Sequence, residues 1–291
     1  MSAPSAATTL FAGSAYDPSA AGGLVAWQRP DGVALIARGD ATESLPGSHP
    51  ALGGSRVAWR DGGQVVIADA ATLAPLERLA APDAGVLALS DTLLAWRTRD
   101  AAGTDRLWVR PLAPAGATRV VLESPAPAEL GRPALAGGLL LCHVAGPRGS
   151  RLVGVDVASG TRRVLRAESG AQVSNPATDG TRLLYVHATG RSQELRLGSL
   201  APADPAGDRV LLVHASSGRR DREHEHSRRR HRQGYPGHRP PPLPPRATPG
   251  VVDTLWGTAL SADTAYVTRL RARRGVPRTG DILRVPLPPL G

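Results

Sequence analysis

The sequence contains no lysine, and it has one cysteine, one asparagine and one phenylalanine among its 291 residues. All 35 basic residues are therefore arginine, and with 25 acidic residues the formal net charge is +10. The dominant residues are alanine, glycine, proline and arginine, which GC-rich codons encode. This bias indicates a high-GC bacterium. The lack of lysine is thus not evidence of selected phosphate binding, although each arginine can still bind phosphate.

The single cysteine, Cys142, excludes an internal disulfide. A chain of this length buries roughly three quarters of its unfolded surface and needs no disulfide to fold. Cys142 follows the apolar residues 139–141, which favours a small core residue over a redox or nucleophilic role. No cofactor is expected.

Long hydrophobic runs are also missing. No window approaches the roughly 18 consecutive apolar residues of a membrane-spanning helix. Residues 1–21 have neither the basic start nor the apolar core of a secretory signal. We expect no transmembrane segment, a cytoplasmic location and a monomer.

One short segment is repeated six times along the chain. Its clearest copies are residues 50–59 (PALGGSRVAW) and residues 176–185 (PATDGTRLLY). In each copy the first residue, usually proline, is followed nine positions later by a large or soft apolar residue, which we call the marker. The six markers are Trp27, Trp59, Trp96, Cys142, Tyr185 and Val267.

The spacing of the markers indicates the architecture. Successive markers are 32, 37, 46, 43 and 82 residues apart. A four-stranded propeller blade takes about 40–50 residues, and short apolar runs separated by Gly, Pro and Asp turns supply up to four strands per repeat, A to D. A β-sandwich also has many short strands, but it does not predict a repeated phrase. The sequence therefore predicts an all-β fold, a six-bladed β-propeller, as a single domain over residues 1–291.

The two ends of the chain predict how the ring closes. The sixth repeat supplies strand A (residues 251–260), strand B (264–268) and strand C (281–285), but no strand D. Residues 8–12 (TTLFA) form a spare strand at the other end. We expect this N-terminal strand to complete the last blade. The tryptophan markers Trp27, Trp59 and Trp96 are expected to pack between blades.

The repeat resembles that of the TolB-type β-propeller, in which a proline strand is followed by a Ser/Thr-Asp-Gly turn and an apolar strand. Residues 176–185 match this pattern best. The resemblance covers about residues 16–285 without the insertion described next, and it implies a fold more than an activity. No counterpart of TolB's N-terminal α/β domain or export signal is seen, so it implies a TolB-like protein made of the propeller alone.

Residues 216–248 differ in kind from the repeats. They form a low-complexity insertion rich in Arg, His and Pro between blades five and six, and carry +6 of the +10 net charge. In a propeller the D–A connections and B–C turns lie on one face, so this face is expected to be basic. Its candidate binding residues are Arg97, Arg99, Arg148, Arg151, Arg219, Arg220, Arg228, Arg229, Arg230, Arg271, Arg273 and Arg274. The alternative is a solvated loop that only reflects codon bias.

Such a face would attract anionic partners through a salt-sensitive field. An acidic protein partner is expected. Nucleic acid is less favoured, because stacking platforms are scarce and Tyr235 is the only aromatic residue of the insertion. Residues 223–226 (EHEH) could bind zinc or nickel, but a metal site needs a preorganised scaffold, so no metal site is predicted. Residues 240–245 (PPPLPP) are interpreted as a stiff spacer.

No catalytic signature is present. The residues that precede the repeats place Asp17, His49, Arg132 and Asn175 at the expected channel mouth, with too few carboxylates for a calcium-dependent lactonase. No G-x-S-x-G motif occurs. Three further histidines lie on apolar strands and are interpreted as core or edge residues: His143, His187 and His214.

We therefore expect a non-enzymatic scaffold for protein–protein interaction and assign no catalytic residue. The alternative is a propeller enzyme, a hydrolase or lyase, with a small site at the channel mouth. Convergence of the four mouth residues in one pocket would favour the enzyme, whereas a channel lined by small apolar groups would favour the scaffold.

Overall fold

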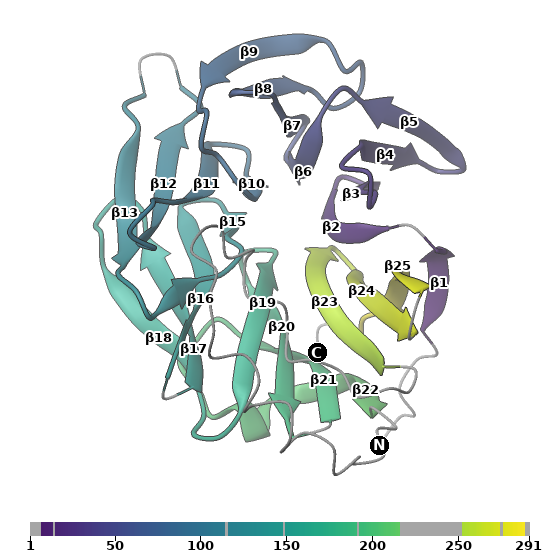
Figure 1. The fold of residues 1–291 in the computed structure, drawn as a ribbon, viewed down its shortest axis with the longest axis vertical. Helices are drawn as coiled ribbons and strands as arrows, with labels where there is room; N and C mark the ends of the chain where they lie inside the picture. The colour runs from purple at the N-terminus through teal and green to yellow at the C-terminus, as the bar shows by residue number, and fades with distance from the viewer. Residues whose placement is uncertain are drawn as a thin grey trace, which may run out of the picture.

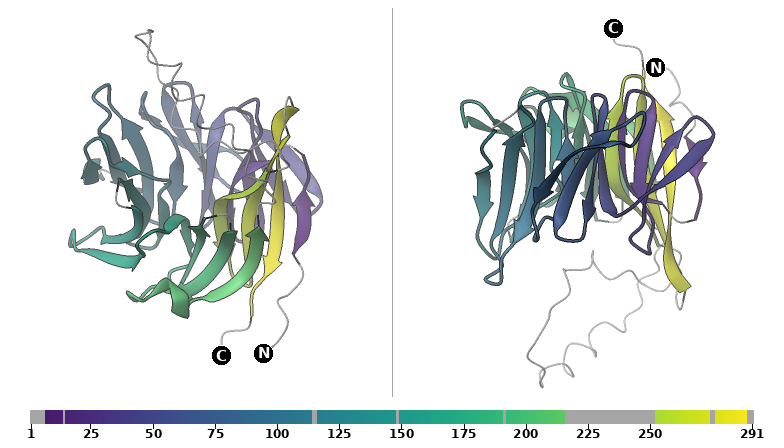
Figure 2. Two further views of the ribbon diagram at one scale, coloured as in Figure 1. Left: turned by 60° about the horizontal axis from the view of Figure 1, so that its bottom comes forward. Right: turned by 90° about the horizontal axis from the view of Figure 1, so that it is seen from above.

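The six repeated segments form the innermost strands of six antiparallel sheets, which stand as blades around a central axis (Figure 1). The structure is a computed structural model that describes residues 7–13, 15–113, 116–147, 149–190, 192–215, 252–273 and 276–288. Side views show the blades standing side by side around this axis (Figure 2). The predicted six-bladed β-propeller is confirmed.

The first three blades each contain four strands in sequence order from the axis outward. Blade one has strands β2 (Tyr16–Ala21), β3 (Leu24–Gln28), β4 (Ala34–Arg38) and β5 (Ala41–Leu45). Blade two has β6 (Ser48–Gly53), β7 (Arg56–Asp61), β8 (Gln64–Asp69) and β9 (Pro75–Ala80). Blade three has β10 (Leu87–Leu89), β11 (Leu93–Arg99), β12 (Asp105–Pro111) and β13 (Arg119–Ser124).

Blades four and five follow the same order, except that the innermost strand of blade four is split in two. Blade four has β14 (Glu129–Leu130) and β15 (Ala134–Ala136), then β16 (Leu139–Gly146), β17 (Gly149–Asp156) and β18 (Arg162–Ala167). Blade five has β19 (Gln172–Thr178), β20 (Arg182–Thr189), β21 (Ser192–Ser199) and β22 (Arg209–Ala215), with a short 3-10 turn, η1 (Pro205–Gly207), before β22.

Blade six is built from both ends of the sequence. It contains β23 (Val252–Ser261), β24 (Thr264–Arg273) and β25 (Val276–Pro286), and its outermost strand is β1 (Thr8–Phe11). Thr8 pairs with Arg284 and Thr9 with Leu283 in antiparallel register. The predicted closure of the ring by the N-terminal strand is therefore confirmed (Figure 1).

Most innermost strands carry a β-bulge at the residue that precedes the repeat. In blade two, Ser48 pairs with Arg60 and Ala51 with Ala58, so His49 and Pro50 together face the marker Trp59. Three of the bulge residues have positive φ angles of 50–52°, and these residues are Asp17, His49 and Asn175. Asp, His and Asn are the types that most often adopt this conformation apart from glycine. The backbone therefore accounts for the identities of these three residues.

Six hydrophobic clusters form the core, one between each pair of neighbouring blades. Every marker belongs to the cluster shared with the preceding blade: Trp59 packs with Ala26 and Ile36 of blade one, and Trp96 with Val65 and Ile67 of blade two. The expectation that the tryptophan markers pack between blades is confirmed. Among the described residues, no helix has the length and apolarity needed to cross a membrane.

Candidate functional site

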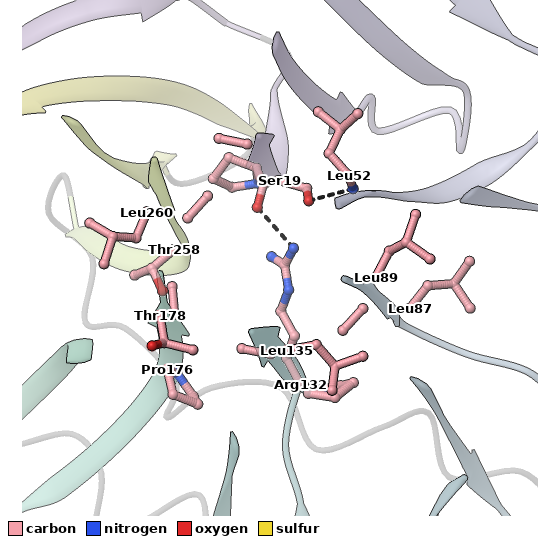
Figure 3. A pocket seen from close by; sticks show the side chains of 17 residues that line it. Ser19, Leu52, Leu87, Leu89, Arg132, Leu135, Pro176, Thr178, Thr258 and Leu260 are labelled. Carbon is pink, nitrogen blue, oxygen red and sulfur yellow. Dashed lines mark hydrogen bonds between the residues drawn. The ribbon is translucent and has the colours of Figure 1, made fainter. Parts of the chain in front are cut away.

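The innermost strands converge on a narrow cavity at the axis of the ring. The residue that follows the first position of each repeat is small in all six copies: Ser19, Ala51, Ala88, Ala134, Ala177 and Ala259. All of these except Ala51 line the cavity, together with leucines and prolines of the same strands. Figure 3 shows these side chains arranged around the axis. Small side chains let six strands approach one another closely, so little free space is left.

The guanidinium of Arg132 spans this space. Arg132 lies between β14 and β15 of blade four, and its Nη2 donates a hydrogen bond of 2.8 Å to the carbonyl of Pro18 in blade one (Figure 3). Its Nη1 lies 3.4 Å from Oδ1 of Asp17. Blade four stands across the ring from blade one (Figure 1). A single side chain thus connects opposite blades at the channel mouth.

The backbone of blade six leaves room for this pair. A Cβ atom at Gly257 would lie 2.7 Å from Asp17 Oδ1 and 3.1 Å from Arg132 Nη1. Only glycine, which has no Cβ, fits there without displacing the pair. The cavity beside Arg132 offers about 60 Å³ to water-sized molecules. This volume suits a few waters or a very small ligand.

His49 is the third mouth residue near the pair. Burial lowers the pKa of its imidazole; Asp17 opposes this shift, and the charges of Arg60, Arg132 and Arg97 add to it. The imidazole is therefore neutral at neutral pH. Its Nδ1 is buried and has no hydrogen-bond partner among the described residues.

Asn175, the fourth predicted mouth residue, makes its backbone hydrogen bonds to neighbouring blades. Its backbone N–H donates to Nδ1 of His143 at 3.4 Å, and its carbonyl accepts from the Thr258 hydroxyl at 2.5 Å. These contacts join blades four, five and six. The structure brings together Asp17, His49 and Arg132, and the backbone of Asn175 links blade five to blades four and six.

A second set of polar residues at the mouth was missed in the sequence. The residue directly after the marker reaches the next blade in several copies: Gln28 Oε1 accepts from the His49 N–H at 2.9 Å, and Arg97 Nη1 donates to the Leu130 carbonyl at 2.6 Å. Arg60 donates to the Pro82 carbonyl. A polar residue recurring after the marker was the signal that could have found them.

The arginines predicted for the basic face have different environments. Arg99 forms ion pairs with Glu129 and Asp105, and Arg271 pairs with Asp281. Arg97 donates to a carbonyl, and Arg151 is exposed without a carboxylate partner among the described residues. In the described part of this face, carboxylates of the rim thus neutralise part of the positive charge.

The other predicted face residues cannot be placed. Residues 216–248 lie outside the described residues, and with them the candidates Arg219, Arg220, Arg228, Arg229 and Arg230. The same holds for Arg148 and Arg274 and for the side chain of Arg273.

The remaining residues that could take part in a reaction are a cysteine and two histidines that pack in the interior. Cys142 is fully buried, and burial raises the pKa of its thiol to about 12. His187 is buried, with Nε2 2.6 Å from a Glu168 oxygen. Burial lowers the pKa of His143 to about 4, with a smaller contribution from Arg97. Within the described ranges, no three His, Cys, Asp or Glu residues are grouped as a metal site requires.

No family model and no curated protein matches the chain. Solved structures do resemble it. TolB from Acinetobacter baumannii is 10% identical with a TM-score of 0.50, over 87% of this chain and 59% of that chain. A structure from a study of two prolyl endopeptidases is 13% identical with a TM-score of 0.51, over 96% of this chain and 42% of that chain.

This chain therefore spans about half the length of these two proteins. At 10–13% identity the likeness concerns the fold and not the activity. The chain is a six-bladed β-propeller with a TolB-like fold.

Proposed function

We propose that this protein is a non-enzymatic scaffold that binds a protein partner through the face formed by its B–C turns and D–A connections. The observation that carries the proposal is the narrowness of the channel along the axis of the ring. Arg132 spans the mouth, and the cavity beside it offers about 60 Å³ and is lined mainly by Pro, Ala and Leu. A macromolecule cannot enter such a channel, so the rim is the surface left for recognition.

An acidic partner fits this face best. Arg60 donates to the Gly62 and Pro82 carbonyls and forms no ion pair among the described residues, and Arg151 is exposed. Stacking of nucleic-acid bases has less support, because Trp108 is engaged within blade three. Its Nε1 donates to Thr98 at 2.9 Å, and its ring stacks on Trp96 at 6.4 Å.

The test is a pull-down from native lysate at low and high salt, with partners identified by mass spectrometry. The intact chain is compared with a chain in which a Gly/Ser linker replaces residues 216–248, and with Arg151→Gln. Arg163→Gln is the matched control, because Arg163 is an exposed arginine near the start of β18, at the opposite end of the blade. An acidic partner lost in the first two variants, kept in the control and released by salt supports the proposal. Identical profiles for all chains contradict it.

A propeller hydrolase or lyase is the second candidate, favoured by the proximity of Asp17, His49 and Arg132. Its test is a panel of small ester, lactone and uronate substrates. Turnover that His49→Asn abolishes and Arg163→Gln preserves would establish the enzyme. Equal rates in all variants would exclude the mouth as its site.

A further inference from the structure

Blade six differs from the other blades in how its outermost strand is attached. In blades one to five, the outermost strand follows its neighbour in the same blade along the chain. In blade six the outermost strand, β1, instead continues into β2 of blade one, and it pairs with β25 from the other end of the sequence (Figure 1). No turn within the blade therefore ties β1 to β25, and only non-covalent contacts hold the two strands together.

The contacts of β1 bury little apolar surface. None of its four residues is buried, and its pairing with β25 is irregular between Thr9 and Phe11. Four of the other five outermost strands contain a buried leucine: Leu45, Leu122, Leu165 and Leu211. Elements with few buried apolar contacts open locally at a lower free-energy cost. β1 is thus among the outermost strands that detach most easily.

The surface that β1 covers is built by residues outside β1. We call it the seat of β1, and it includes Trp27, Asp281, Ile282 and Leu283. The Phe11 ring stacks on Trp27 with centroids 3.8 Å apart, and the Gly13 N–H donates to Asp281 Oδ1 at 2.9 Å. Arg269 also pairs with Asp281, at 2.9 Å, so this carboxylate is held without β1. The seat therefore persists when β1 leaves, with an apolar surface and a free strand edge.

The chain can change direction directly after β1. Ala15 is fixed on blade six, because its N–H donates to the Gly280 carbonyl at 3.0 Å and it is buried. Gly13 precedes it with a φ angle of 86°. Glycine populates positive and negative φ about equally well, so the chain can turn at Gly13 without strain. β1 can thus leave its seat while Ala15 and β2 stay in place.

We propose that the seat of β1 is an interaction surface for β1 of a second copy of this chain. The structure itself shows which segment fits: a neutral extended strand with an aromatic ring for Trp27 and, two positions later, a glycine N–H for Asp281. A second copy offers this same segment. Mutual exchange gives a two-fold pair of rings in which both seats are filled. This surface is separate from the rim proposed above, and each proposal can fail without the other.

The closed ring remains the main form, because each chain's own β1 competes for the seat. A short linker gives such a strand an effective concentration in the millimolar range, so at about 50 µM protein a second copy fills only a few per cent of the seats. This share rises with protein concentration. A covalent bond that forms only in the exchanged pair should accumulate it.

Disulfide trapping with the full chain tests the exchange. Thr8 and Arg284 are directly paired and exposed, and paired residues of antiparallel strands lie close enough for a disulfide. The single variants Thr8→Cys and Arg284→Cys are mixed under mild oxidation. We expect a covalent heterodimer whose yield rises with concentration, with the disulfide between positions 8 and 284 identified by mass spectrometry. The native Cys142 is buried and does not compete.

Three controls make the result decisive. Arg163→Cys, exposed on β18, replaces Thr8→Cys and should give a several-fold lower yield. An excess of a peptide of residues 7–13 should suppress the heterodimer, and the double variant Thr8→Cys/Arg284→Cys should close within one chain. A yield no higher than with Arg163→Cys, or one that the peptide leaves unchanged, overturns the proposal. A peptide that binds without any heterodimer would assign the seat to a strand of another protein and overturn the second copy as partner.

Discussion

At the scale of single residues, the backbone conformation explains why certain polar residues occupy the channel mouth, where they could be mistaken for catalytic residues. Asp17, His49 and Asn175 look like a polar constellation in the sequence, yet all three occupy positive φ at a bulge next to a proline. For a residue other than glycine, that conformation costs roughly 1–2 kcal/mol. Residue type at these positions therefore reflects local strain before it reflects any ligand.

This account predicts opposite effects for two substitutions of His49. His49→Gly should keep or slightly raise the free energy of unfolding, because glycine adopts a φ of 52° without strain. His49→Val should lower it by about 1–3 kcal/mol, because a β-branched residue is strained there. Urea denaturation measures both. Equal losses for Gly and Val would mean that the imidazole, and not the backbone, stabilises the bulge.

His143 predicts a pH dependence of stability. Burial lowers its pKa to about 4 in the folded chain, against about 6.5 when unfolded. Between these values the unfolded state binds the proton and the folded state does not, so stability falls as pH drops from 6.5 to 4. The loss approaches about 3 kcal/mol. Urea midpoints across this range should show it.

The matched variant for this prediction is His143→Asn, which cannot titrate. Its free energy of unfolding should change less over the same pH range. A slope identical to that of the parent would show that His143 is not responsible. Because both chains share all other titratable groups, the difference between their slopes isolates this histidine.

At the scale of elements, the strands and their order could be predicted because each repeat has its own marker, apolar runs and turn residues. The markers fix every B strand, and residues 8–12 were correctly assigned to blade six, observed as β1 (Thr8–Phe11). The bulges and the contact between Arg132 and Pro18 could not be predicted. The bulges depend on how each innermost strand pairs with its neighbour in the same blade. The contact depends on the distance across the ring, and no spacing within one blade determines that distance.

The N-terminal strand gives the prediction at this scale. Deleting residues 1–12 should lower the melting temperature by several degrees, because β1 completes blade six and Phe11 stacks on Trp27 with ring centroids 3.8 Å apart. Phe11→Ala should reproduce part of the loss, about 1–2 kcal/mol. Leu10→Ala is the control, since Leu10 is exposed on the same strand. Calorimetry checks these values, and an unchanged melting temperature after the deletion would falsify the stabilising role of β1 in blade six.

The carboxylate of Asp281 also stabilises the closure of the ring by β1. Burial would raise the pKa of Asp281, but hydrogen bonds from Arg269 and from the Gly13 N–H, with the charge of Arg271, hold it below its usual value. The carboxylate therefore remains charged and holds the segment after β1 against β25. This contribution is lost only when the pH falls below the usual range of an aspartate.

At the scale of the whole molecule, stability resides in six interfaces between blades. The interface of blades five and six includes Leu195, Leu255 and Val267, and Gln193 accepts from the Leu255 N–H at 2.6 Å. These described residues join the two blades irrespective of the segment that connects them in sequence.

Replacing residues 216–248 by a Gly/Ser linker should therefore leave the melting temperature within about a degree of the parent's. Leu195→Ala, in the same interface, should lower stability by about 2–5 kcal/mol. Differential scanning calorimetry of the two variants distinguishes them. A linker chain that melts as low as Leu195→Ala would place the insertion among the stabilising parts of the ring.

Because blade six contains both β1 and β25, the ring can close only after β25 has been synthesised. Gly13 and its partner Asp281 are 268 positions apart in the chain. A ribosome adding 5–20 residues per second needs on the order of ten seconds to a minute to cover that interval. Throughout this time β1 has emerged without its partner, and the first five blades can stack only as an open arc. Of the strands in the ring, β25 is thus made last, and it is the strand that pairs with β1.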